Sequence, residues 1–354
     1  MENIDLQGKK VIVTGGGGYI GCHAVWKLLE YNMKVVVVDT MENANPQFLD
    51  ESLAEKLIGR KLQNGELSVC KGSTGDITFM EGVMTAHPDV FAVFNFAAYV
   101  EVGESVSDPL KYYTNNTCSV INLLKVLVGH KVKYFIQSST AAVYGDIKGT
   151  EPIEEDAPTL PINSYGQSKL MVEKILADCA RAHGLSYVCF RYFNVCGNHP
   201  TGLIGERRKH ETHLVPIVIG AATGKRDKLT VFGDDYPTRD GTCVRDYVDM
   251  EDLIEGHLSG LKYLLGGGQS RAINLGSGQG FTVKEVIEEV KRVTGKTFPV
   301  VIGGRRDGDP AVLVASNGLA KEILGWTPKR SLGESIKNVW THHTLHMGEG
   351  GQGH

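Results

Sequence analysis

A short apolar run enters a turn of four glycines at Val11-Ile12-Val13-Thr14-Gly15-Gly16-Gly17-Gly18-Tyr19-Ile20-Gly21, and a helical pattern follows at 24–31. The stretch predicts a strand, a tight turn and a helix. Glycines at 15, 18 and 21 leave room for the backbone to approach a pyrophosphate and for the helix to pack close to the strand, with the helix N-terminus directed at the anion. A glycine run alone is often only a flexible turn.

A second apolar strand strengthens the interpretation of the glycine turn. The run Val35-Val36-Val37-Val38 ends in Asp39, and an acid about 20 residues after such a turn can accept hydrogen bonds from an adenosine ribose. The same carboxylate would repel a 2′-phosphate, so the sequence favours NAD over NADP. The alternative is that Asp39 is an ordinary turn residue at the end of a strand.

Composition limits the class of protein. The chain has 354 residues, of which 42% are hydrophobic and 22% charged, values typical of a globular protein that can hold two domains or one large domain with a smaller lobe. Its formal charge of −4 argues against a nucleic-acid partner or an anionic membrane surface, because both need a basic face.

Cysteine usage and the N-terminus predict a cytoplasmic protein. The first ten residues are polar and no later stretch reaches the length of a membrane span. The cysteines are widely spread without a C-x-x-C pair, so no disulfide framework and no metal site is indicated. We expect all seven to be buried small residues: Cys22, Cys70, Cys118, Cys179, Cys189, Cys196 and Cys243.

Strand and helix patterns alternate along the first half, which predicts an α/β fold with a parallel sheet covered by helices on both faces. The apolar run 91–98 ends in Ala97-Ala98, small residues at the carboxyl end of a strand, where ligands bind in open α/β sheets. The expected strands are 11–13, 35–39, 67–70, 90–96, 134–139 and 230–232. The expected helices are 24–31, 52–62, 78–87, 115–128, 164–182, 214–223, 252–265 and 283–294.

Tyr165 and Lys169 open a predicted helix and share one of its faces, because they lie four residues apart. A free tyrosine has a pKa of about 10, so a tyrosine that acts as a base near neutral pH needs its phenolate stabilised, at about 1.36 kcal/mol per pKa unit. A fixed lysine cation and a nicotinamide cation are the obvious means. The strand end Ser138-Ser139-Thr140 precedes this pair. Its hydroxyls can cap a helix, satisfy the backbone or face a ligand.

These motifs, T-G-G-G-G-Y-I-G, Asp39, S-S-T and Y-x-x-x-K, resemble the extended short-chain dehydrogenase/reductase family. Further matches are similar to the UDP-galactose 4-epimerases of that family and cover essentially the whole chain apart from its tail. The resemblance implies an NAD-binding Rossmann sheet, doubly wound and parallel, in a domain at 1–194, and a smaller α/β lobe that binds the UDP-sugar at 195–354, with some segments interleaved. The further matches lie at 102–106, 112–116, 191–194, 232–238, 241–247, 273–276 and 305–309.

The resemblance also implies a reaction, the NAD-dependent interconversion of UDP-galactose and UDP-glucose by transient oxidation at sugar C4. Tyr165 would take the O4 proton, Thr140 would hydrogen-bond O4, and Lys169 would hold the nicotinamide ribose and lower the pKa of Tyr165. It implies a homodimer formed by helices around 115–128 and 170–182, with a role in galactose metabolism.

The remaining site residues are carried over from the same resemblance. Those implied to contact NAD are Gly15, Gly18, Tyr19, Ile20, Gly21, Asp39, Thr40, Asn43, Phe96, Ala97, Ala98, Asn115, Tyr165, Lys169 and Phe193. Those implied to contact the UDP-sugar are Thr140, Tyr165, Asn194, His213, Leu214, Thr230, Phe232, Arg245, Arg306, Asp309 and Leu313.

The chain departs from the family pattern at four places. Val100 stands where better-known members have lysine, and His213 where many have asparagine. The usual Gly-Asp-Ile adenine contact is replaced by Gly72-Ser73-Thr74, unless Gly75-Asp76-Ile77 serves in its place. Leu313 occupies a gate that is tyrosine in narrow members, which predicts that UDP-GlcNAc and UDP-GalNAc are accepted as well.

Three other functions are alternatives to UDP-galactose 4-epimerisation. A nucleotide-sugar 4,6-dehydratase needs an acid and a base directly after the threonine, where this chain has Ala141-Ala142. A 4-epimerase for pentose or uronate sugars differs only in pocket detail, and an NAD-sensing protein without turnover would not need Thr140, Tyr165 and Lys169 together. The tail from His342, with its glycines, is expected to be a solvated end.

Overall fold

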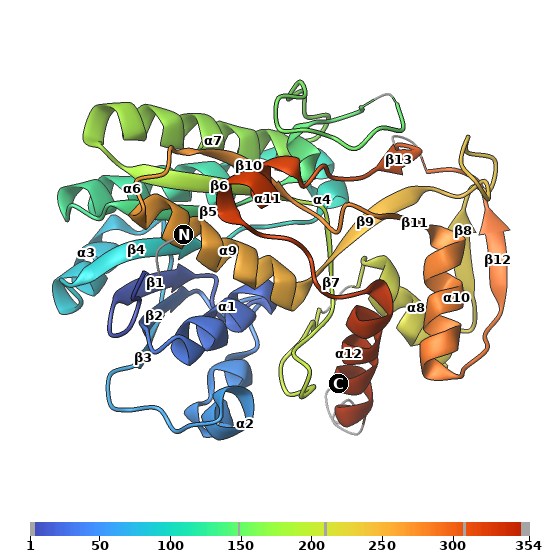
Figure 1. Cartoon of the computed structure of the whole chain (residues 1–354), viewed down its shortest axis with the longest axis horizontal. Coiled ribbons are helices and arrows are strands. Elements are labelled where there is room, and N and C mark those ends of the chain that lie inside the picture. Colours follow the sequence, from blue (N-terminus) through green and yellow to red (C-terminus); the bar gives the residue numbers. More distant parts are fainter. Residues whose placement is uncertain (1–3, 148, 209–210, 307–308, 348–354) are drawn as a thin grey trace.

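A seven-stranded parallel sheet forms the centre of the molecule (Figure 1). The computed structural model describes residues 4–147, 149–208, 211–306 and 309–347. The strand order is β10-β6-β5-β4-β1-β2-β3, so the chain reverses its winding direction between β1 and β4, which is where ligands bind in doubly wound sheets. The strands are β1 (Lys10–Thr14), β2 (Lys34–Asp39), β3 (Leu67–Lys71), β4 (Val90–Asn95), β5 (Tyr134–Thr140), β6 (Ser186–Tyr192) and β10 (Arg271–Leu275).

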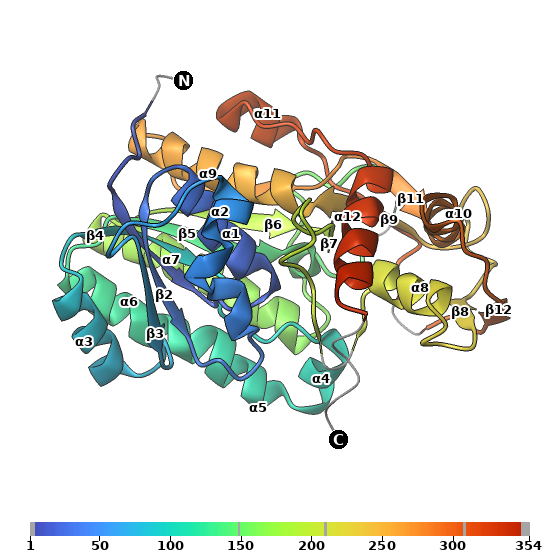
Figure 2. The ribbon, with the colours of Figure 1, turned by 90° about the horizontal axis from the view of Figure 1, so that it is seen from below.

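Both faces of this sheet are buried, because alternate residues of each strand point to opposite helix layers. Val11 and Val13 pack with one layer, whereas Ile12 packs with the other. The first layer holds α1 (Tyr19–Glu30), α2 (Ala54–Ile58), α9 (Met250–Leu265) and α11 (Gly318–Leu324). The second layer holds α3 (Ile77–Ala86), α6 (Ser119–Gly129) and α7 (Ser164–His183), and Figure 2 shows the sheet between the two. The predicted α/β fold class is therefore confirmed.

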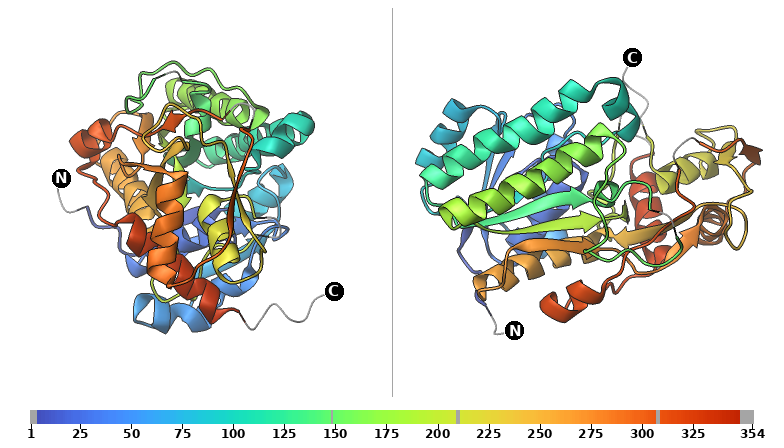
Figure 3. Two further views of the ribbon diagram at one scale, coloured as in Figure 1. Left: turned by 90° about the vertical axis from the view of Figure 1, so that its right-hand side faces the viewer. Right: turned by 90° about the horizontal axis from the view of Figure 1, so that it is seen from above.

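A smaller α/β lobe lies beyond one end of the sheet (Figure 3). Its hydrophobic core joins helices α8 (Leu214–Ala222), α10 (Val283–Thr294) and α12 (Leu332–Leu345). Strands β11 (Gly280–Thr282), β9 (Val244–Asp249) and β13 (Val312–Leu313) form one small sheet, with β7 (Asn194–Cys196) also paired to β9, and β8 (Leu229–Phe232) pairs with β12 (Val300–Gly303).

The chain passes between the large sheet and the smaller lobe more than once. Strand β10 and helix α9 come late in the sequence, yet β10 pairs with β6 at the edge of the large sheet and α9 packs against α1, β5 and β6. The division at residue 194 is therefore a prediction about folding units, and the sheets themselves are interleaved in sequence.

Short helices connect these elements and modify several expectations. The 52–62 region is helical only at η2 (Glu51–Leu53) and α2, after a turn at η1 (Pro46–Leu49). The expected helix 115–128 is preceded by α4 (Val102–Ser107) and α5 (Pro109–Tyr112), and its start is a π-helix, η3 (Tyr113–Cys118). A last short turn is η4 (Ala141–Val143). No helix of the described residues is long and apolar enough to cross a membrane.

Two predictions of burial are wrong. Cys118 is exposed and Cys70 and Cys179 are partly exposed, and Cys70 lies on β3, the edge strand of the large sheet. His342 is buried rather than solvated: α12 places it against the Phe48 ring of η1, and its Nδ1 lies 2.7 Å from the carbonyl oxygen of Gly202. The tail beyond residue 347 lies outside the described residues. Burial lowers the pKa of His342 to about 4, so this histidine packs as a neutral side chain.

A buried ion pair connects α7 to the sheet. Arg191 on β6 donates from Nη2 to Oε2 of Glu173 at 2.6 Å, and each side chain is 8% exposed. Ser139 Oγ also donates to Glu173 at 2.5 Å, and Tyr144 bonds the same guanidinium at 3.1 Å. The charges are thus fully hydrogen-bonded, the condition under which a buried pair is tolerated.

Removing one partner of this pair should destabilise the protein strongly. We expect Glu173→Ala to lower the free energy of unfolding by about 3–5 kcal/mol, because Arg191 would remain charged, buried and uncompensated. Glu288→Ala, which removes a surface pair with Lys291, should change it by less than about 0.5 kcal/mol. Urea unfolding of both variants measures the difference, and equal losses would contradict the structural role assigned to the buried pair.

Candidate active site

The glycine turn lies between β1 and α1 in a conformation that other residues would disturb. Gly15 has a φ of 68°, and a Cβ on it would lie 2.7 Å from the backbone nitrogen of Ala97. A Cβ on Gly21 would lie 2.0 Å from the carbonyl oxygen of Gly15. Both positions therefore require glycine, and the strand, turn and helix pack as closely as the sequence predicted.

The first turn of α1 fits a bound phosphate group. Gly18 is the N-cap residue and supplies no capping side chain, so the free N–H groups of this helix end are available to an anion. Asp39 at the end of β2 accepts a hydrogen bond from Gly17 N at 2.9 Å and one from Met41 N at 2.8 Å. The carboxylate thus lies beside the turn, as a ribose contact requires, with Thr40 and Asn43 exposed next to it.

The end of β4 lies beside the turn and is connected to α7. Phe96, Ala97 and Ala98 are half-buried, and Ala97 N donates to Thr14 Oγ1 at 3.3 Å. Asn115 lies in the π-helix, where its neighbour Asn116 bonds both Tyr99 N at 2.9 Å and Ser168 Oγ at 3.1 Å. Such π-helical turns often occur at functional sites, and this one fixes the segment after β4 against α7.

Tyr165 and Lys169 lie where α7 meets the end of β5. Asn163 caps the helix by accepting from Gly166 N at 2.8 Å, and Gly166 is needed there because a Cβ would lie 2.5 Å from the oxygen of Ala142. Lys169 is buried, and its Nζ donates to the carbonyl oxygen of Ser138 at 2.8 Å. The Tyr165 phenol lies close enough to the Thr140 hydroxyl for that group to lower its pKa. The structure therefore brings together all three predicted catalytic side chains.

The protonation of this group follows from its surroundings. Burial raises the pKa of Tyr165, a hydrogen bond with Thr140 and the Arg208 charge lower it, and Glu101 raises it, with a net increase. Burial lowers the pKa of Lys169 to about 8, against the effect of Cys189 and Glu173. The predicted action of Lys169 on Tyr165 remains a prediction, since the amine here is directed at Ser138.

Several predicted substrate residues gather in the second lobe. Arg245 lies on strand β9 and donates from Nη1 to Pro310 O at 2.8 Å, with Nη2 3.4 Å from the Asp309 carboxylate. The Arg306 guanidinium lies 3.9 Å from the centre of the Phe232 ring, which is 39% exposed on β8 with Thr230. Asp307 and Gly308 of this motif lie outside the described residues.

Leu313 and two neighbours connect the lobes near the catalytic group. Leu313 is paired with Arg245 through β13 and β9, and it packs against a small cluster that includes Phe193 and Ala141. Asn194 is exposed on β7, directly after Phe193. The Leu313 side chain thus lies next to Ala141, which directly follows Thr140, and its role as a gate stays a prediction.

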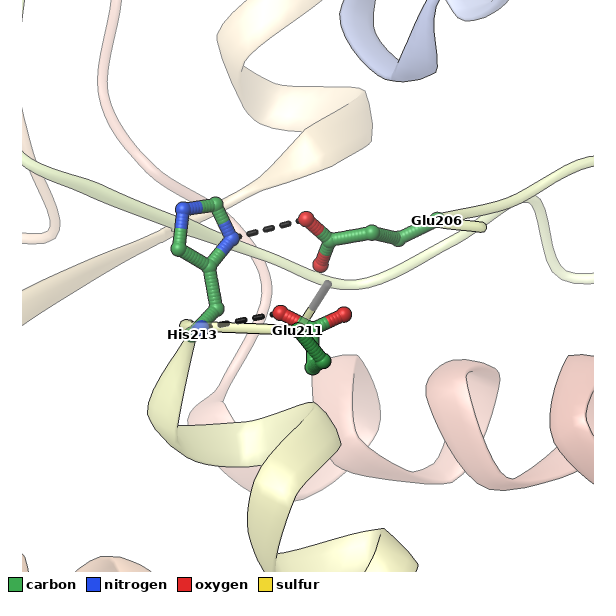
Figure 4. A group of neighbouring side chains, drawn as sticks. All are labelled: Glu206, Glu211 and His213. Atoms are coloured by element: carbon green, nitrogen blue, oxygen red, sulfur yellow. Dashed lines mark hydrogen bonds and ion pairs between the residues drawn. The ribbon is translucent and has the colours of Figure 1, made fainter. Parts of the chain in front are cut away.

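Next to the start of α8 is a charged group that the sequence prediction includes only in part. His213 precedes Leu214, and its Nδ1 lies 2.7 Å from Glu206 Oε1, while Glu211 accepts from His213 N at 2.8 Å (Figure 4). The Glu206, Glu211 and His213 ligand atoms lie within 4.8 Å of one another, a spacing that could hold a metal ion. Arg208 Nε, however, is 2.6 Å from the same Glu206 oxygen, so a cation already neutralises this carboxylate and the group is an ion-pair network.

Sequence reasoning missed Glu206, Arg208 and Glu101, whose charges lie near the site. The mixed charges of 205–211 were the available signal, but such a run is usually a solvated surface.

The structure also bears on the adenine contact, because Gly72-Ser73-Thr74 directly follows β3. Asp76 instead caps α3 by accepting from Phe79 N at 3.0 Å.

The fold and the site together define a Rossmann-type enzyme in which a tyrosine, a lysine and a threonine lie on the same edge of the sheet as a dinucleotide-binding turn. A family model described as the NAD dependent epimerase/dehydratase family matches residues 11–276, and the chain belongs to this family.

Individual relatives agree with this assignment. The UDP-glucose 4-epimerase of Halalkalibacterium halodurans is 43% identical over 337 residues, which cover 95% of this chain and 96% of that protein. The UDP-glucose 4-epimerase of Stenotrophomonas maltophila, solved with NAD and formylated UDP-arabinopyranose, has a TM-score of 0.90 at 36% identity and covers 96% of this chain and 99% of that one. The enzyme of Bifidobacterium longum, solved with NAD⁺ and UDP, has a TM-score of 0.87 at 36% identity, with 96% and 99% covered.

Alanine at Gly15 should abolish retention of NAD. The variant combines the left-handed backbone, which costs about 1–2 kcal/mol for other residues, with a collision against the Ala97 backbone. Gly59→Ala is the matched control, since Gly59 has a φ of 71° but open space around its Cβ position. We expect NAD, measured after denaturation of the purified protein, to be lost from Gly15→Ala and kept in Gly59→Ala. Equal retention in both would contradict the assigned role of the turn.

Proposed function

We propose that this protein interconverts UDP-galactose and UDP-glucose by transient oxidation at sugar C4, with NAD as a resident cofactor and a role in galactose metabolism. The observation that carries the proposal is the meeting of Tyr165, Thr140 and Lys169 at the end of β5, on the same edge of the sheet as the glycine turn. Relatives named UDP-glucose 4-epimerase, at 43% and 36% sequence identity, support it.

Tyr165 and Thr140 handle the proton of the sugar O4 hydroxyl. Bound NAD⁺ supplies a hydride acceptor for C4. Tyr165 accepts the O4 proton as the C4–H bond breaks and the carbonyl forms, and Thr140 holds O4 in place by a hydrogen bond. After the sugar turns over, Tyr165 returns the proton to O4 as C4 regains hydride on its other face, so no cofactor is consumed.

Lys169 is suited to hold the nicotinamide ribose and to supply positive charge. With a pKa of about 8, the amine is mostly protonated at neutral pH, and burial strengthens its electrostatic effect. The rest of the proposed cofactor site consists of the glycine turn, Asp39, the end of β4, Asn115 and Phe193.

The second lobe is proposed to bind the UDP moiety. Arg245 and Arg306 suit bidentate contacts with the diphosphate, and Asp309 positions Arg245. Glu206 raises the pKa of His213, although burial opposes this, and so favours the charged form of the imidazole. Leu214, Thr230 and Phe232 are proposed to flank the uridine, with Asn194 contacting the nucleotide from β7.

Replacing the phenol tests the proposal directly. We expect Tyr165→Phe to reduce the rate of UDP-glucose formation from UDP-galactose by about 10²- to 10⁴-fold, the range that general acid–base groups contribute, and to leave NAD bound. Tyr31→Phe, on an exposed ring at the end of α1, is the control and should keep full activity. Chromatography of the sugar nucleotides measures both. Undiminished turnover by Tyr165→Phe would refute the mechanism.

Two alternatives remain on specific grounds. The Stenotrophomonas maltophila relative was solved with a UDP-pentose derivative, so a 4-epimerase of another UDP-sugar is the second candidate. A protein that only senses NAD is the third candidate. It would bind the cofactor in Tyr165→Phe and in Tyr31→Phe, and it would convert no sugar nucleotide in the unaltered protein. A dehydratase is disfavoured by Ala141 and Ala142, which offer no acid or base after Thr140.

Leu313 is proposed to permit sugars with an N-acetyl group at C2. We expect the protein to interconvert UDP-GlcNAc and UDP-GalNAc, and Leu313→Tyr to reduce this activity about tenfold or more by filling the space while UDP-galactose turnover is largely kept. Leu313→Met, which nearly conserves volume, should retain both activities. Chromatographic rates on both sugar pairs decide, and absence of N-acetyl activity in the unaltered protein would refute the proposed breadth.

We also propose a homodimer and a cytoplasmic location. Apolar side chains on α4, α5 and α7 are exposed beside the expected interface, with Val106 at 65%, Leu110 at 74% and Met171 at 36% exposure. An apolar patch of this kind is typical of protein–protein contacts. All seven cysteines are free, which suits a reducing compartment.

A further inference from the structure

Arg208 forms ion pairs that connect the two lobes beside the proposed active site. It belongs to the segment between β7 and α8, and its Nη1 lies 2.9 Å from Oε1 of Glu101, which precedes α4 in the first part of the chain. Its Nε lies 2.6 Å from Glu206 Oε1, and the side chain is 21% exposed. Two carboxylates therefore hold this guanidinium in one place.

The position of Glu101 relates this network to Tyr165. Glu101 is the N-cap residue of α4, and α4 packs against α7, whose first turn carries Tyr165. The segment before Glu101 is also fastened to α7 through Asn116, which bonds Tyr99 and Ser168. The charges act on the phenol in opposite directions, since Arg208 lowers the pKa of Tyr165 and Glu101 raises it.

We propose that Arg208 is a positioning residue for the reaction, a cation fixed by Glu206 and Glu101 that controls how readily the Tyr165 phenol exchanges its proton. This inference rests on the proposed function, because it concerns the acid–base group of that reaction. Arg208 acts through space on Tyr165, and Glu101 both anchors it and opposes it.

The other charged and titratable groups around this pair are accounted for. On β5, Thr140 also acts on the Tyr165 phenol, and on β6 the titratable Tyr192 interacts with Tyr165. On α7, the Lys169 amine donates to the Ser138 carbonyl oxygen. Around Arg208, Glu211 is a further carboxylate and His213 shares Glu206 with it. Since Arg208 has its own bond to Glu101 as well as to Glu206, it stays in place when His213 loses its proton.

The neighbouring arginine provides a matched control. The Arg207 guanidinium lies over the Phe48 ring, 5.5 Å from its centre, on the side of the loop that faces η1. Adjacent cations on this segment are thus directed to different surfaces. Arg207→Gln removes the same charge from the same loop without removing the group held by Glu101.

The first readout is the pH dependence of kcat/KM for the purified protein with its NAD. We expect Arg208→Gln to move the acid limb to higher pH and Glu101→Gln to lower pH, each by about half a unit, as one partly exposed charge produces over several ångströms. At neutral pH this is about a threefold loss for Arg208→Gln. Arg207→Gln should leave the limb in place, and Arg208→Lys should move it back toward the position in the unaltered protein.

The second readout is independent of turnover. The phenolate form of tyrosine is followed by ultraviolet difference titration. The chain has 13 tyrosines, so the titration of the matching Tyr165→Phe variant is subtracted in each background to leave the signal of Tyr165. The same opposite shifts are expected. Shifts in one direction for both variants, or none, would overturn the proposal, because general damage to the site cannot move the titration both ways. If no UDP-sugar is converted, the proposed function fails while this titration still decides the role of Arg208.

Discussion

The hydrogen bond from the buried Lys169 amine to the Ser138 carbonyl oxygen is the contact on which the site depends. At 2.8 Å it fixes the second turn of α7 on the end of β5. Tyr165, one turn earlier, is thereby placed beside Thr140. Gly166 permits this approach, because any side chain there would collide with Ala142. The geometry of the acid–base group thus follows from how one helix is attached to one strand.

Two networks of charged side chains lie near the Lys169–Ser138 hydrogen bond, and they have different roles. The inner one, Glu173 with Arg191, is buried on all sides and holds α7 against the sheet. The outer one, Glu206 with Arg208 and Glu101, is partly exposed and crosses between lobes. The first fixes the fold, since it joins α7 to β5 and β6 through Ser139 and Arg191. The second lies close enough to influence the phenol, and it also joins the segment after β4 to the start of α8.

The sequence predicted those features that depend on local spacing. The glycine turn, Asp39 and the Tyr165–Lys169 pair are each encoded within a few residues of a strand end, and the structure places them along the same edge of the parallel sheet. Features that depend on distant contacts were not predictable. Arg208 and Glu101 are 107 positions apart, and nothing local to either indicates the other.

The same reason explains the burial errors. His342 has the composition of a solvated tail around it, yet it is buried by a hydrogen bond to Gly202 across 140 positions. Strand β10 likewise joins β6 only through the folding of the second half back onto the first sheet. The π-helical turn at Tyr113–Cys118 likewise packs against α7, which lies about 50 residues later in the chain.

The central claim is that this site removes hydride from sugar C4 and returns it to the same carbon without outside help. Incubation of the purified protein, with no added cofactor, with UDP-galactose deuterated at C4 tests it most directly. The account predicts UDP-glucose that retains deuterium at C4, formed in ordinary water. Loss of the label to solvent, or dependence on added NAD in each turnover, would contradict it.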